Sequence, residues 1–120
     1  MSKILYVTTY AANDPTKATL PFILSVGALA AGHNPQIALL AEAPLLTKDS
    51  IAEQINGVGF PPLVELWSKL IDHEVPIYVL GHCSVARGVT DEDLQGKKAT
   101  FASAQDFDEL VAAADKVVSF

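Results

Sequence analysis

Cysteine is almost absent from this chain of 120 residues: Cys83 is the only one, so no internal disulfide can form. A reducing cytoplasm favours such a composition, and we expect the protein to reside there. Long hydrophobic runs are also missing, since none reaches the roughly 18 residues of a membrane-spanning helix. Residues 1–3 lead straight into an apolar segment, without the pattern of a removable leader. We therefore expect neither a membrane anchor nor a signal peptide.

Positive charge is scarce as well. Eight Lys and Arg residues stand against fourteen Asp and Glu, which gives a formal net charge of −6. Nucleic acids and anionic membranes both require a basic surface, so we expect neither as a partner. Half of the residues are hydrophobic and the mean hydropathy is +0.30. We expect residues 1–120 to form one domain, with enough apolar surface to favour a homo-oligomer.

Strand-like and helix-like patterns alternate along the chain. Runs of β-branched, aromatic and aliphatic residues predict strands at residues 4–8, 35–41, 77–80, 98–102 and 117–120. Asp14 and Pro15 are typical of a helix start, and this helix should end at Gly32, with Pro21 causing a kink or a later start. Further helical patterns cover residues 48–55 and 63–73. The alternation predicts an α/β protein whose parallel sheet carries helices on both faces.

Two hydroxyl residues mark the remaining helical segments. Thr90 is expected to cap a short turn over residues 91–95, and Ser103 a final helix. The apolar face of that final helix is predicted to consist of Phe107, Leu110, Val111 and Ala114.

Cys83 follows the third predicted strand, where reactive groups gather in a parallel sheet. Arg87 lies four residues further on. If Ser84 begins a helical turn, this spacing brings the guanidinium to the side of the sulfur, and free backbone N–H groups add to the stabilisation of a thiolate. A lone cysteine is otherwise a small buried hydrophobe. The pattern leaves a reactive and an inert thiol equally open.

Several templates for cysteine and metal chemistry do not fit. There is no Cys-x-x-Cys pair, and the sixth position after Cys83, where a phosphatase loop carries arginine, is Val89. His82 is adjacent to Cys83, and neighbours on a strand face opposite ways, so we expect it to flank the site rather than to deprotonate the thiol. His33 and His73 show no zinc-ligand spacing. We expect no metal and no cofactor, since nucleotide-binding glycine motifs are also missing.

The loop after the first strand is a second candidate. Tyr10, Asn13 and Asp14 follow that strand and are expected to border the same edge of the sheet as Cys83, where they can orient a ligand. The alternative is that Asp14 only caps the helix that follows.

Several segments together resemble a known family. They are Asp14–Pro15 with Leu20–Phe22, Ala31–His33, Gly59–Leu63, Val75–Val79, Cys83 with Ala86–Val89, and Thr90–Leu94. In their order and spacing they resemble the DsrE-like family (DsrE/DsrF and TusD-type proteins) of small sulfur-relay proteins. The resemblance implies a three-layer α/β/α domain with a five-stranded parallel sheet, assembled into trimers or hexamers.

The resemblance also implies an activity. In relay members, a cysteine after the third strand accepts sulfane sulfur as a persulfide and passes it on, and Cys83 matches that position. It implies a sulfurtransferase-like carrier with protein donors and acceptors of sulfur. From their positions in the sequence, Arg87, His82 and Ser84 are the candidate residues around the thiol. Two other functions remain open: a non-catalytic subunit that binds a small ligand or partner near Tyr10, Asn13 and Cys83, and a redox sensor oxidised at Cys83.

Overall fold

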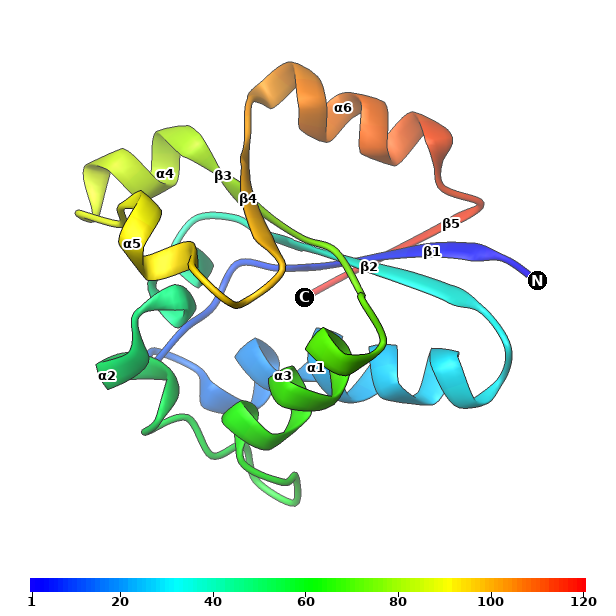
Figure 1. Ribbon diagram of the computed structural model, residues 1–120, viewed down its shortest axis with the longest axis horizontal. Coiled ribbons are helices and arrows are strands. Elements are labelled where there is room, and N and C mark those ends of the chain that lie inside the picture. The colour runs from blue at the N-terminus through cyan, green and yellow to red at the C-terminus, as the bar shows by residue number, and fades with distance from the viewer.

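A computed structural model describes residues 1–120. Five parallel strands form one sheet in the order β4-β3-β2-β1-β5 (Figure 1). The strands are β1 (Lys3–Thr8), β2 (Asn34–Leu39), β3 (Ile77–Leu80), β4 (Ala99–Ala102) and β5 (Lys116–Ser119). The helices are α1 (Pro15–Ala30), the 3₁₀ helix η1 (Ala43–Thr47), α2 (Asp49–Ala52), α3 (Leu63–Asp72), α4 (Gly81–Ala86), α5 (Asp91–Leu94) and α6 (Ala104–Ala113).

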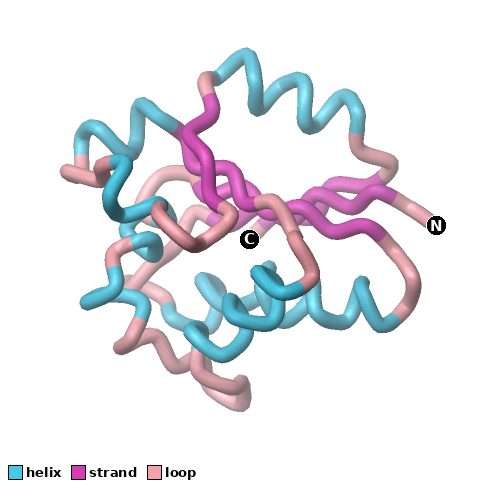
Figure 2. The backbone as a smooth tube through the Cα atoms, viewed as in Figure 1, coloured by secondary structure: helices cyan, strands magenta, loops and turns pink.

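The sheet lies between two helical layers, which confirms the three-layer α/β/α architecture (Figure 2). Helices α1 and α3 cover one face and α6 covers the other (Figure 1). The short helices η1, α2, α4 and α5 lie beyond the carboxyl ends of the strands, the edge at which parallel sheets carry their sites. No helix combines the length and apolar character needed to cross a membrane.

The main core lies between the sheet and the pair α1 and α3. Phe22 and Trp67 pack with ring centroids 4.9 Å apart, over the fully buried Ile37 and Ile77 of the central strands. The indole nitrogen of Trp67 donates to the Lys97 carbonyl at 3.0 Å, so its one polar atom is satisfied. This layer fixes the position of β2 and β3, and therefore of the loops that follow them.

Of the two effects predicted for Pro21, a kink or a later start of α1, the structure excludes the later start. The helix begins at Pro15, where Asp14 Oδ1 accepts a hydrogen bond from the Lys17 N–H at 3.0 Å. Because Pro21 has no N–H, the Lys17 carbonyl lacks its usual helical partner. The hydroxyl of Thr8, at the end of β1, donates to this carbonyl at 3.1 Å instead. A side chain from the sheet thus replaces the missing backbone bond.

The second helical layer is thinner than the first. No residue of α6 is buried, although Phe107, Leu110 and Ala114 pack against the sheet. Val111, predicted on this apolar face, is 37% exposed, so that prediction is wrong. It follows Leu110 by one residue, about 100° around the helix, and is not among the residues that pack against the buried cluster on this side of the sheet. Strand β5 at the sheet edge is exposed along its whole length.

Candidate functional site

Cys83 lies in the first turn of α4. Helix α4 begins at Gly81, directly after β3 ends at Leu80, so the helical turn starts three residues before Ser84 and includes Cys83. The chain passes from strand to helix without a loop. The Ser84 hydroxyl is buried and donates to the Leu80 carbonyl at 2.8 Å, which fastens α4 to the end of β3. Cys83 is half-buried and its thiol is free.

His82 lies on a different side of α4 from Cys83. A groove of about 570 Å³ runs between α4 and the end of β4, and His82, Val85 and Phe101 are among its lining residues while Cys83 is not. His82 therefore flanks the thiol, as predicted, but the physical reason differs. The prediction assumed an extended strand, whereas both residues lie in a helix, where successive side chains are about 100° apart.

Arg87 folds back onto the turn that carries Cys83. Its Nη1 donates to the Cys83 carbonyl oxygen at 3.2 Å, and its Nη2 donates to Glu42 Oε1 at 2.6 Å. The i, i+4 spacing thus brings the guanidinium to the expected turn. It forms its hydrogen bonds to the backbone and to Glu42, however, and none to the sulfur. Glu42 is a site residue that the sequence analysis missed.

Glu42 joins three neighbouring segments at this edge of the sheet. Glu42 follows β2. The residue before it, Ala41, has a left-handed backbone conformation with a φ of 54°, which costs a non-glycine residue roughly 1–2 kcal/mol. The Glu42 N–H donates to the carbonyl of Thr9, just past β1, at 3.2 Å. Its carboxylate binds Arg87 of the segment after β3. Only the strand order β3-β2-β1 reveals this arrangement, which the sequence alone does not give.

The ion pair changes the acidity of both partners. The hydrogen bond from Arg87 lowers the pKa of Glu42, and the opposing effect of desolvation is smaller. The pKa of Arg87 is raised, mainly by its hydrogen bond to Glu42. Desolvation lowers this pKa by less, and the charges of Glu42 and of an ionised Cys83 raise it further. Glu42 is therefore the main partner of the guanidinium, and its carboxylate offsets much of the Arg87 charge next to Cys83.

Tyr10, Asn13 and Asp14 interact within their own loop and helix. Asp14 caps α1, and Asn13 Oδ1 accepts from the Ala11 N–H at 2.9 Å. The Tyr10 ring lies under the ammonium of Lys17, 5.0 Å from ring centroid to nitrogen. None of the three forms a hydrogen bond or ion pair with α4. The two candidate loops are joined only through Thr9, Glu42 and Arg87.

No three His, Cys, Asp or Glu side chains come together in an arrangement that could hold a metal ion. His33 Nδ1 instead accepts from the Ser2 N–H at 3.0 Å, and His73 Nδ1 lies 2.9 Å from the Lys69 carbonyl oxygen. Both side chains thus have local contacts at helix ends.

Comparison with known proteins places the whole chain in one family. The family model for DsrE/DsrF-like proteins matches residues 2–120. The ychN protein from E. coli has a similar structure, with a TM-score of 0.72 and 20% identity over 100% of both chains. A conserved protein of unknown function, BT1422 from Bacteroides thetaiotaomicron, has a TM-score of 0.66 and 13% identity over 99% of this chain and 95% of its own. No curated protein matches.

The Glu42–Arg87 pair predicts a pH-dependent contribution to stability. Because the folded-state pKa of Glu42 is lowered, this contribution is present above the ordinary glutamate pKa and is lost as the pH falls through the lowered one. Replacing Arg87 by Gln should return the Glu42 pKa towards its ordinary value. Carbon-detected NMR titration of the side-chain carboxyl groups measures this. An unchanged Glu42 titration in Arg87→Gln would contradict the pairing, and Asp106, held by its cap to Ser103, serves as the unaffected reference.

Proposed function

Because this chain belongs to the DsrE/DsrF-like family over residues 2–120, we propose that it is a sulfur carrier that holds sulfane sulfur on Cys83. One observation carries the proposal: the only thiol of the chain is half-buried in the first turn of α4, beside the cationic Arg87 and at the carboxyl edge of the sheet. Single-thiol carriage needs no second cysteine and no cofactor. A free thiol that must stay reduced suits a reducing compartment such as the cytoplasm.

The proposed transfer consists of two thiol exchanges. The Cys83 thiolate attacks the outer sulfur of a donor persulfide, so that a new S–S bond forms at Cys83 while the donor S–S bond breaks. The electron pair of the broken bond leaves on the donor thiolate, and the outer sulfur keeps its proton. An acceptor thiolate then attacks the same outer sulfur and releases the Cys83 thiolate. No net oxidation or reduction takes place, which fits a site with one cysteine.

The neighbouring residues have distinct roles in this proposal. Arg87 supplies positive charge to the anionic sulfur, and Glu42 holds the guanidinium in place while it moderates that charge. Ser84 anchors the helix that carries the thiol. His82 lines the groove along α4, on a different side of the helix from the thiol, and takes no part in the exchange.

A second function is favoured by the hydrogen bonds of Arg87. The guanidinium binds Glu42 and the Cys83 carbonyl rather than the sulfur, as expected in a subunit whose Cys83 is only structural and which binds a ligand or partner without catalysis. The two functions differ in whether Cys83 accepts sulfur.

Persulfide transfer to Cys83 tests the proposal directly. After incubation with a small-molecule persulfide donor, intact-mass spectrometry should show the protein with one added sulfur atom, removable by dithiothreitol. Cys83→Ser should gain none. A matched control is Cys83→Ser combined with Ser68→Cys, which places the single thiol on the exposed side of α3. Loading of this control as fast as wild type would show that the site confers no special reactivity, and no loading of wild type would refute the carrier function.

We also propose that the protein is a homo-oligomer, a trimer or hexamer, in which exposed apolar residues of α6 and β5 form the contact. Val111 of α6 is 37% exposed and Val117 of β5 is 44% exposed. The outer edge of β5 has no partner strand, because β5 ends the sheet. These features give one side of the molecule an apolar surface of the kind that subunits cover.

Sedimentation velocity tests this contact. The wild type should sediment as a trimer or hexamer, and Val111→Glu should shift it towards the monomer because a charge cannot be buried there without a partner. Val64→Glu is the matched control: Val64 has a similar exposure, 41%, but lies on α3 in the other layer. A monomeric wild type, or dissociation by Val64→Glu alone, would contradict the proposed interface.

A further inference from the structure

The sheet face beneath α6 buries Leu5, Val7 and Ala38 but also carries polar side chains, whereas the central strands are apolar on the opposite face. On the α1 and α3 side, β2 and β3 present Ile37, Leu39, Ile77 and Val79, all fully buried. Because side chains alternate along a strand, Gln36 and Tyr78 belong to the α6 side. Lys3 of β1 and Thr100 of β4 share that face by register. Polar groups beneath a helix need partners.

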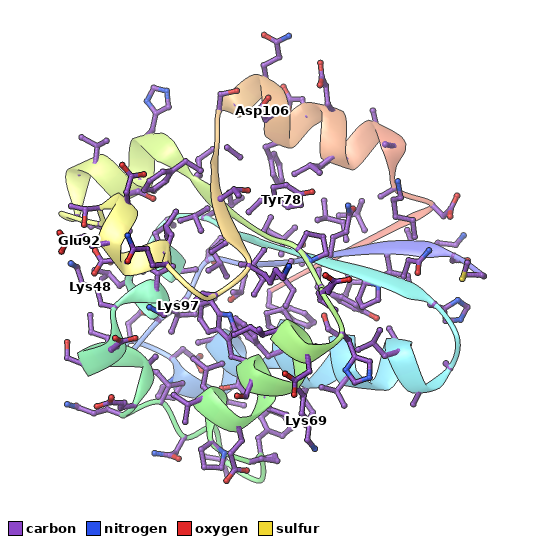
Figure 3. All side chains as sticks on the ribbon, in the orientation of Figure 1. Lys48, Lys69, Tyr78, Glu92, Lys97 and Asp106 are labelled. Atoms are coloured by element: carbon purple, nitrogen blue, oxygen red, sulfur yellow. The ribbon has the colours of Figure 1, made fainter.

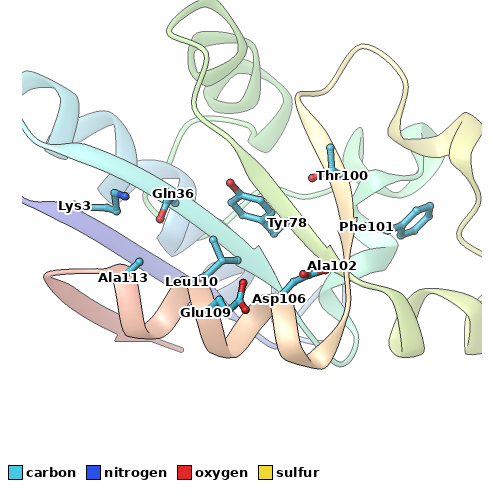
Figure 4. A pocket seen from close by; sticks show the side chains of 10 residues that line it. All are labelled: Lys3, Gln36, Tyr78, Thr100, Phe101, Ala102, Asp106, Glu109, Leu110 and Ala113. Atoms are coloured by element: carbon cyan, nitrogen blue, oxygen red, sulfur yellow. The ribbon is translucent and has the colours of Figure 1, made fainter.

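These side chains line a pocket of about 280 Å³ between α6 and strands β2 to β4 (Figure 4). The helix contributes Glu109 and Leu110, and the strands contribute Lys3, Gln36 and Tyr78. Figure 3 shows Tyr78 between the sheet and α6, on the same side of the sheet as Asp106. The pocket lies just below the roughly 300–1,000 Å³ of sites for drug-sized ligands, so it suits a smaller molecule.

Gln36 brings an unsatisfied acceptor to this pocket. Its side-chain oxygen is buried and has no hydrogen-bond partner in the protein. Folded proteins seldom leave such an atom unpaired. Because the oxygen is buried, a rotation of the terminal amide is needed to bring it to the pocket that the same side chain lines. Lys3, Tyr78 and Thr100 line the same pocket and carry donors, but none of them bonds this oxygen, which leaves it available to a donor from a bound molecule.

Two opposite charges at the pocket are also unpaired. The four ion pairs of the protein involve neither Lys3 nor Glu109. Asp106, the other acidic residue of the lining, is already engaged, because its Oδ2 accepts from the Ser103 N–H at 2.9 Å. Figure 4 shows Gln36 next to Lys3, and the Leu110 side chain and the Tyr78 ring add an apolar surface to the lining. A positive and a negative group joined by a short apolar chain complement this lining.

We propose that the pocket beneath α6 binds a small zwitterion, of the amino-acid or ω-amino-acid class. Its ammonium group is held by Glu109 and the Gln36 side-chain oxygen, its carboxylate by Lys3, and its carbon chain by Tyr78 and Leu110. This site lies on a sheet face, apart from the carboxyl edge that carries Cys83, and does not depend on the sulfur-carrier function.

Three matched probes test the site: 6-aminohexanoate, hexanoate, which lacks the amine, and hexylamine, which lacks the carboxylate. Titrations of ¹⁵N-labelled protein should give saturable amide shifts in α6, β2 and β3 with 6-aminohexanoate. Each single-charge probe should bind at least about tenfold more weakly, a loss of about 1.4 kcal/mol. The shifts should be unchanged in Cys83→Ser. Absence of saturable shifts with 6-aminohexanoate, or binding of hexanoate or hexylamine as tight as that of 6-aminohexanoate, would overturn the proposal.

Variants separate a binding role from a structural one. Glu109→Gln and Gln36→Leu should each weaken 6-aminohexanoate binding at least about tenfold. Glu65→Gln on α3 is the charge-matched control and should bind as wild type does. Gln36→Leu should also raise the melting temperature by a few degrees, since it removes an unpaired buried acceptor. Undiminished binding in Glu109→Gln, or a lower melting temperature in Gln36→Leu, would overturn the assignment.

Discussion

The site at the sheet edge depends on one guanidinium. Arg87 donates to the carbonyl of Cys83 and to the carboxylate of Glu42, and the backbone of Glu42 is bonded in turn to Thr9. This chain of contacts joins the segments that follow β1, β2 and β3, which lie side by side only because of the strand order. It fixes α4 and places a positive charge near the only thiol. In the proposed function, the balance between Arg87 and Glu42 sets how reactive that thiol is.

The two faces of the sheet differ in how they are covered. The layer of α1 and α3 forms a dense core around Phe22 and Trp67, and it makes the frame that carries the site. The layer of α6 has no buried residue, and it leaves an unpaired Gln36 oxygen beneath the helix and exposed valines outside it. In many proteins a densely packed region provides the stability and a less densely packed region carries the binding sites. We accordingly assign small-molecule and subunit contacts to the α6 side.

Much of the fold could be predicted from the sequence, because local signals determine it. The predicted strand over residues 77–80 is confirmed without change, and Asp14 and Ser103 cap the predicted helices. Predictions failed where a tertiary contact overrides local preference, as when Thr8 bonds the carbonyl freed by Pro21. Glu42 was missed because its role follows from strand order. The family resemblance is confirmed over residues 2–120, whereas the chemical roles of Cys83 and its neighbours remain predictions.

The central claim is that Arg87 activates Cys83 and that Glu42 moderates this effect. The rate of Cys83 alkylation by iodoacetamide at a fixed neutral pH measures the thiolate fraction directly. We predict that Glu42→Gln alkylates faster than wild type, because Arg87 then acts on the sulfur without an opposing charge. We predict that Arg87→Gln alkylates more slowly, because only the negative charge of Glu42 is left near the thiol. Equal rates for the wild type and both variants would contradict the account.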